Sequence, residues 1–137
     1  MGMFVDPNAR VPVTDGSNTI YVKARMDAQT RGLYENELQR LKAKKDIAET
    51  EEIEYAYMGT AKVLLRVYNI VAWEGPDFLD GNGNLVPCTR YNIMRMDPLT
   101  PLWEMVGDRI GELNRKPESP DPNAAAPTGS TTDGEPR

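Results

Sequence analysis

The last 21 residues, 117–137, contain no valine, isoleucine, leucine, methionine or aromatic side chain, and they include five prolines and two glycines. Such a segment cannot bury enough apolar surface to offset the entropy that a chain loses when it becomes ordered. We therefore expect a disordered, acidic tail, rich in proline, glycine and threonine, over 117–137. It serves either as a solubilising terminus or as a segment that orders on a partner. The rest of the 137-residue chain is long enough for one small core.

The composition excludes the common catalytic sites that need histidine or several cysteines. Histidine is absent and Cys88 is the only cysteine. Cys/His metal sites, Ser-His-Asp and Cys-His nucleophile systems and an internal disulfide are therefore excluded. Cys88 has no CxxC partner, and we interpret it as a small buried apolar residue.

Two acidic segments remain as candidates for chemistry. Residues 49–54 hold four carboxylates, but no apolar surroundings would raise their pKa values, so we interpret this segment as a solvated connector. Residues 80–84 begin like a calcium loop, but Leu85 and Tyr91 stand where that loop needs glycine and glutamate. A tight turn at Asn82-Gly83 is the better interpretation. We expect a protein that is not an enzyme and has no catalytic residues, metal or cofactor.

Charge and hydropathy indicate which partners and which cellular compartment to expect. The formal net charge is −5, and a negative protein is repelled by the phosphates of nucleic acid, so we expect no nucleic-acid partner. No stretch reaches the roughly 18 apolar residues of a membrane span, and residues 1–7 lack the basic and apolar regions of a signal peptide. These features predict a soluble, intracellular protein with no membrane contact.

The pattern of turn formers and apolar residues predicts an α+β fold. Residues 1–18 are interrupted by proline, glycine, asparagine and aspartate, and we expect an irregular N-terminal arm there. Residues 19–116 then form a single folded α+β domain, mostly helical, with a short N-terminal strand at 19–24 and about four helices. Three helices have clear starting signals: 28–45 after Asp27, a short helix after Thr89, and 101–114 opened by Pro101.

Residues 60–73 are the most hydrophobic part of the chain, and both helix and strand stay open there. The polar residues Lys62, Arg66 and Asn69 lie four and three apart, which favours a helix with one narrow solvated stripe. The β-branched residues favour a strand. We prefer the helix, because the run is long for a single strand, and we expect Gly75-Pro76 to terminate it.

A string of short motifs runs through the second half of this domain: Ile70-Val71-Ala72-Trp73-Glu74-Gly75-Pro76-Asp77-Phe78, Asp80-Gly81-Asn82-Gly83, Val86-Pro87-Cys88-Thr89, Asn92-Ile93-Met94, Asp97-Pro98, Pro101-Leu102 and Ile110-Gly111-Glu112-Leu113-Asn114. The string resembles the tail assembly chaperones of long-tailed (siphovirus-type) bacteriophages. In these small acidic proteins an apolar helix ends in tryptophan, and a glycine-rich turn carries an acidic residue. A capped "Pro-x-Thr, Asn-Ile" helix precedes the last helix. The similarity covers roughly residues 19–114.

The resemblance implies a function by binding. A member of this family would bind the tape-measure protein in the cytoplasm of the infected host, keep its long apolar helices soluble and help recruit tail-tube subunits. Homo-oligomerisation stays open. In many members a ribosomal frameshift yields a longer form, and residues 117–137 would be the short form's terminus or a linker. The alternative is a structural virion component, such as a connector, tail or decoration subunit, whose arm 1–18 enters a neighbouring subunit.

A chaperone for apolar helices needs adaptable apolar surface, and methionine and aromatic side chains supply it. The final third of the chain brings four such residues close in sequence, and they are the candidate partner-binding residues: Tyr91, Met94, Met96 and Trp103. Trp103 lies off the apolar stripe of the last helix, where it would be partly exposed or at the edge of the core. The competing interpretation is that the methionines fill gaps in a small core.

Overall fold

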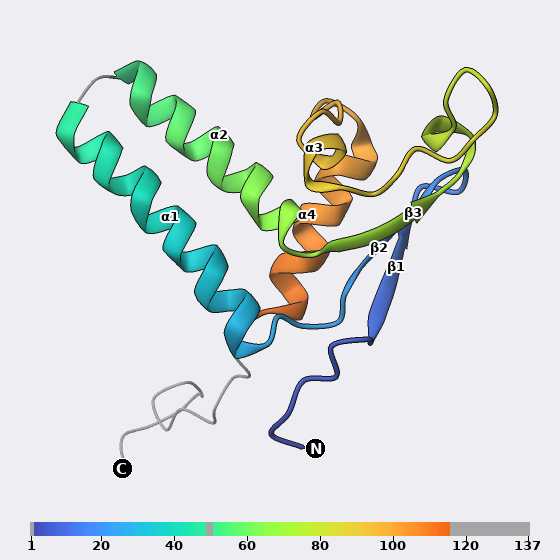
Figure 1. Cartoon of the computed structure of the whole chain (residues 1–137), viewed down its shortest axis with the longest axis horizontal. Coiled ribbons are helices and arrows are strands. Elements are labelled where there is room, and N and C mark those ends of the chain that lie inside the picture. Colours follow the sequence, from blue (N-terminus) through green and yellow to red (C-terminus); the bar gives the residue numbers. More distant parts are fainter. Residues whose placement is uncertain (1, 49–50, 116–137) are drawn as a thin grey trace, which may run out of the picture.

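The computed structural model describes residues 2–48 and 51–115 (Figure 1). The predicted tail 117–137 lies outside the described residues. The elements follow in the order β1 (Arg10–Thr14), β2 (Thr19–Lys23), α1 (Ala28–Ala48), α2 (Glu51–Val67), β3 (Ile70–Glu74), the 3₁₀ turn η1 (Pro76–Phe78), α3 (Arg90–Ile93) and α4 (Pro101–Leu113). The fold class is α+β, as predicted. Helix makes up 45% and strand 17%, so the expectation of a mostly helical chain is met only loosely.

The three strands form one antiparallel sheet in the order β1-β2-β3. β1 corrects the prediction of an arm that is irregular over 1–18. Val11 and Val13 lie opposite Val22 and Ile20 of β2, so one hairpin face is apolar. Pro12 concealed this pattern in the sequence. It is tolerated because β1 is an edge strand, where a missing N–H need not interrupt a ladder.

The segment 60–73 is divided between the two predicted structures. The helix is confirmed as far as Val67, where α2 ends, but the prediction is wrong beyond it, because β3 begins at Ile70. Ile70 and Trp73 lie opposite Val22 and Ile20, with a register shift in between. Gly75 therefore ends a strand and not a helix. A strand forms here because pairing with β2 buries side chains that would have no partner if α2 continued to residue 73.

The predicted solvated stripe on this segment is also wrong. Lys62 is exposed, but only 3% of Arg66 is accessible and Asn69 is fully buried. Both buried side chains have backbone partners: the guanidinium donates to the carbonyl of Trp103, and the amide of Asn69 donates to that of Leu65. Only Lys62 meets the expectation, because Arg66 and Asn69 pack inside the protein.

Helices α1 and α2 form a hairpin that extends away from the sheet (Figure 1). Asp27 caps α1 as predicted, with its carboxylate accepting the Thr30 N–H at 2.8 Å, and the helix runs three residues past the expected end at 45. Helix α2 begins at Glu51, so the acidic segment 49–54, predicted as a connector, is helical from that residue onward. Residues 49 and 50 lie outside the described part.

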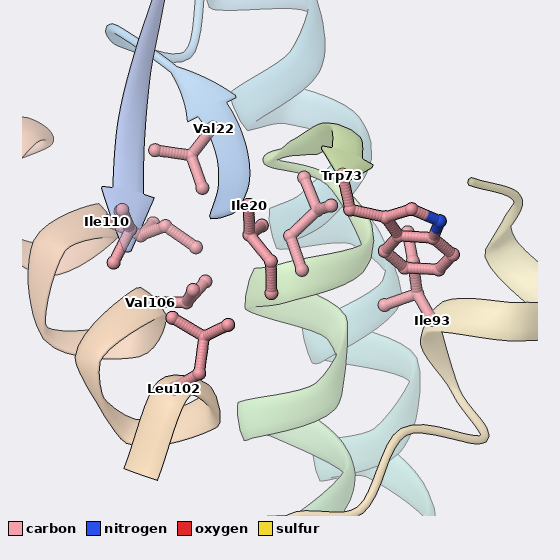
Figure 2. Packing of buried hydrophobic residues seen from close by; sticks show 9 residues of the cluster. Ile20, Val22, Trp73, Ile93, Leu102, Val106 and Ile110 are labelled. Carbon is pink, nitrogen blue, oxygen red and sulfur yellow. The ribbon is translucent and has the colours of Figure 1, made fainter. Parts of the chain in front are cut away.

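The core lies between the sheet and α4 (Figure 2). Helix α4 begins at Pro101, as predicted, and points Leu102, Val106 and Ile110 at Ile20 and Val22 of β2. The ring of Trp73 packs beside Ile93 of α3 at the other end of the same cluster. This core fixes where the last strand and the two last helices stand relative to one another, and a groove opens along that junction.

Candidate partner-binding groove

The groove has a volume of about 510 Å³ and lies where three parts of the chain meet: the β1–β2 turn, the segment from β3 to Val86, and the segment joining α3 to α4. Its apolar lining residues include Trp73, Phe78, Val86, Met96 and Leu102. We call these apolar lining residues the floor, and we call the polar lining residues the rim: Asp15, Asn18, Asp77, Asn92, Arg95, Asp97 and Thr100. Pro101 also lines the groove. An apolar surface bordered by polar groups is a common form of a binding site.

The floor is held by the indole of Trp73. Its ring stacks on that of Phe78, with centroids 4.8 Å apart and planes 10° from parallel. Its Nε1–H donates to the Val86 carbonyl oxygen at 2.6 Å. One buried side chain thus ties β3 to the turn η1 and to the strand-like end of the following loop. The floor is therefore formed before any partner arrives, which lowers the entropy cost of binding.

One side of the rim is locked by Asn18. Its amide nitrogen donates to the Asp77 carboxylate at 2.7 Å, and its amide oxygen accepts the Asp77 backbone N–H at 3.1 Å. Asn18 is 5% exposed and Asp77 is exposed, so this partly buried pair joins the β1–β2 turn to η1. Gly75 makes the close approach possible, since it has φ 135° and a Cβ there would lie 2.3 Å from the Asn18 amide oxygen.

The loop above the floor folds as the predicted turn. Gly83 has φ 81°, and the Asp80 carboxylate accepts the N–H groups of Asn82 at 2.8 Å and Asn84 at 3.0 Å. Leu79 and Leu85 pair across the turn, and about half of each side chain is exposed. The asparagine, glycine and aspartate residues therefore serve turn chemistry and present two leucines beside the groove.

The opposite wall is the short helix α3. Thr89 caps it as predicted, because its hydroxyl oxygen accepts the Asn92 N–H at 3.2 Å. The Asn92 amide donates to the Pro87 carbonyl at 2.9 Å, which holds the entering chain against the helix. Arg95 follows the helix, and its guanidinium lies 4.7 Å from the centre of the Tyr91 ring. This wall is stabilised by local contacts that its sequence already suggests.

The rim carries more negative than positive charge. Asp15, Asp77 and Asp97 stand against Arg95 in the described groove. The N–H groups of Asn18 and Ser17 donate to the Asp15 carboxylate, and they hold its pKa below the ordinary value. The Asp97 carboxylate accepts the Leu99 N–H at 2.9 Å. None of these three aspartates has a cationic partner among the described side chains.

The candidate partner-binding residues do not come together in one place. Met96 is half-buried and lines the groove, whereas Tyr91 and Met94 stand outside it, 65% and 48% exposed. Trp103 is 4% exposed and packs beneath Arg66, so of the two alternatives for this residue the structure favours the core over partial exposure. Helical position alone could not show that a buried guanidinium would cover this ring.

Several groove residues were not predicted as contact residues. Trp73, Phe78, Val86 and Leu102 come from separate segments, and only the three-dimensional fold brings them together. The signal that could have found them is the motif string itself, because each of these four residues belongs to it.

Two further kinds of group bear on chemistry: the thiol of Cys88 and side chains that could hold a metal ion. Cys88, predicted to be a small buried residue, is half-buried and packs against the core, and burial raises the pKa of its thiol. Among residues 2–48 and 51–115, no group of three or more histidine, cysteine, aspartate or glutamate side chains is placed to hold a metal ion. Within the same residues, no helix combines the length and apolar character needed to cross a membrane.

Comparison of the chain with protein-family models, with curated protein sequences and with solved structures finds no match. The resemblance to phage tail assembly chaperones therefore rests on the motif string alone.

Proposed function

We propose that this protein is a tail assembly chaperone of a long-tailed bacteriophage. It binds the tape-measure protein in the cytoplasm of the infected host and helps recruit tail-tube subunits. The observation that carries the proposal is the convergence of the motif string on one surface. The members of the string that line the groove are Trp73, Asp77, Phe78, Val86, Asn92, Asp97, Pro101 and Leu102.

The groove has the properties that such a task requires. Its floor is apolar and fixed by stacking and by the Trp73–Val86 hydrogen bond, so it can take an apolar side chain from a helical partner. Leu79, Leu85 and Leu99 are exposed on the neighbouring loops and extend the apolar contact. Binding at such a surface covers apolar groups of the partner until the tube assembles around it, and it needs no catalytic residue.

A second candidate function, a structural virion subunit, has its own supporting observation. Met3 and Phe4 are each 96% exposed, which is unusual for large apolar side chains outside a contact surface. Because β1 fixes Arg10–Thr14 in the sheet, the arm that could enter a neighbouring subunit is shorter than 1–18 and consists of the residues before Arg10. In this alternative the protein stays in the particle at fixed stoichiometry.

The deciding experiment is co-expression of the full chain with the tape-measure and tube proteins of its phage, followed by affinity capture, with purified particles probed in parallel. Capture of the tape-measure protein without incorporation into particles supports the chaperone. Two matched variants locate the contact: Met96→Lys places a charge in the groove, and Met105→Lys places one on exposed α4 surface outside it. We expect the first to abolish capture and the second to preserve it. Incorporation into particles without capture would contradict the proposal and support the alternative.

A further inference from the structure

We propose that the groove selects a cationic amphipathic segment, in which an apolar side chain enters the floor and a neighbouring lysine or arginine meets the rim. This inference rests on the proposed function in that it takes the groove as the partner site. It adds the charge of the partner, which the apolar floor alone does not determine.

The carboxylates of the rim have no cation beside them among the described side chains. Asp15 lies on the β1–β2 turn, Asp77 on η1 and Asp97 after α3, so three separate segments each bring a carboxylate to the same groove. Three carboxylates elsewhere on the described surface have cations, Glu35 with Arg31, Glu37 with Arg90 and Glu112 with Arg109. Others, such as Asp6 and Asp80, accept backbone N–H groups and form no ion pair among the described side chains. The rim carboxylates have backbone and amide donors but no cation, so they leave a local negative potential around an apolar floor.

Arg95 also lines the groove, but its guanidinium does not neutralise this potential. Arg95 stacks on the exposed ring of Tyr91 and forms no ion pair with a rim aspartate among the described side chains. The hydrogen bonds that Asp15 receives from Ser17 and Asn18 stabilise its ionised form. The rim is therefore charged before binding, and it favours a partner cation without requiring a conformational change.

Charge also decides between the possible occupants. The chain's own segment 117–137 carries four carboxylates and one arginine, and it has no large apolar side chain to place on the floor. The arm of a second copy offers Met3 and Phe4 but brings Asp6 with them. Nucleic acid would bring phosphates to a rim of carboxylates. A segment with both an apolar anchor and a cation is the occupant that fits both parts of the groove.

The test uses two synthetic helical peptides with the same leucine and phenylalanine face, one flanked by lysines and the other by glutamates. Each is titrated into the isotope-labelled full chain, and binding is followed at the indole N–H resonance of Trp73 and at the backbone amides of 76–78. We expect the lysine peptide to shift these resonances, with affinity falling as ionic strength rises, and the glutamate peptide to leave them unchanged. Equal binding of both peptides, or shifts confined to other surfaces, would overturn the inference.

Two charge-reversal variants sharpen the test without removing any core contact. Arg95→Glu adds negative charge at the rim, and we expect it to tighten lysine-peptide binding by about fivefold, the scale of exposed charge pairs. Arg109→Glu makes the same change in net charge on α4, outside the groove, and should leave the affinity unchanged. Equal effects of the two variants would show that total charge, and not the rim, attracts the peptide, and the inference would be wrong.

Failure of this inference can be told apart from failure of the proposed function. If the lysine peptide binds the groove but the tape-measure protein is not captured, the charge preference holds and the function is wrong. If the tape-measure protein is captured and the lysine peptide neither binds nor competes with it, the function holds and the charge preference is wrong.

Discussion

The guanidinium of Arg66 lies over the ring of Trp103, with its central carbon 4.2 Å from the ring centre. It also donates to the carbonyl oxygen of the same residue, from Nε at 3.1 Å and from Nη2 at 2.8 Å. A third donor, Nη1, reaches the Lys62 carbonyl at 2.8 Å. Burial lowers the pKa of Arg66, but the carboxylates of Glu104 and Asp108 act in the opposite direction. A buried cation thus joins α2 to α4 through backbone carbonyls.

This contact requires a glycine at position 107. A Cβ there would lie 2.2 Å from Nη2 of Arg66, and the hydrogen bonds to Trp103 restrict how far the guanidinium can withdraw. We expect Gly107→Ala to lower the free energy of unfolding by about 2 kcal/mol, since the overpacking exceeds the gain in helix propensity. Urea denaturation with tryptophan fluorescence measures the change.

Gly111 provides the matched control in the same helix. Nothing lies within 4 Å of the position of its Cβ, so Gly111→Ala should stabilise the protein by up to about 1 kcal/mol through helix propensity. If Gly107→Ala stabilised the protein equally, Arg66 could not be packed against this face of α4.

Local signals were the predictable part of the fold. The capping residues Asp27 and Thr89, the proline at 101 and the Asn82-Gly83 turn act through neighbours within a few positions, and the structure confirms each of them. The apolar stripe of α4 is equally local, because helical spacing determines which residues share a face. Caps, turns and helix faces can be predicted from sequence because they depend on neighbouring residues and not on distant segments.

The errors arose where a distant segment decided the outcome. Its local sequence predicts that Arg66 is solvated, but the ring and carbonyl of Trp103 on α4 bury it. Ile70 is in a strand because it pairs with β2. Pro12 made β1 look irregular, although an edge position tolerates it. The groove belongs to the same class, since its lining joins residues from three segments, and no spacing rule connects Trp73 with Leu102.

Gly75 should be sensitive to substitution for two reasons. Its φ of 135° is a conformation that residues with a side chain rarely adopt, and a Cβ would meet Asn18 at 2.3 Å and the Ser17 carbonyl at 2.9 Å. Gly75→Ala should therefore break the Asn18–Asp77 pair and cost about 3 kcal/mol. Thermal unfolding followed by circular dichroism would measure the loss.

Gly83 separates the two causes. It also has positive φ, 81°, but nothing lies within 4 Å of its Cβ position. Gly83→Ala should cost only the backbone strain, about 1 kcal/mol. An equal loss for both variants would indicate that the contact with Asn18 contributes nothing.

Glu37 couples the helical hairpin to α3 and should make stability depend on pH. Its carboxylate accepts hydrogen bonds from both terminal nitrogens of Arg90, each at 2.8 Å, and from the hydroxyl of Tyr68. These donors, Arg90 first, lower the pKa of Glu37 from 4.5 to about 2. A carboxylate whose pKa is lowered by folding stabilises the protein above its ordinary pKa, and this contribution is lost as pH falls from about 4.5 to about 2.

The variant Glu37→Gln isolates this contribution. Because about half of the Arg90 side chain is exposed, solvent screening limits the pair to about 1 kcal/mol at neutral pH. We expect the stability difference from the parent to shrink below pH about 4.5 and to disappear near pH 2. Glu35→Gln, whose ion pair with Arg31 is longer and more exposed, should match the parent throughout. A Glu37 difference that is constant with pH would show that the pair does not form.

Two phenylalanines allow the same substitution to be compared on an exposed arm and in the groove. Phe4 is 96% exposed, so Phe4→Ala should change the free energy of unfolding by less than about 0.5 kcal/mol. Phe78 is half-buried and stacked on Trp73, so Phe78→Ala should cost about 2 kcal/mol and weaken binding at the groove. Denaturation at several protein concentrations measures both variants. If Phe4→Ala destabilised the protein in a concentration-dependent way, the arm would be buried in another copy, as the virion-subunit alternative requires.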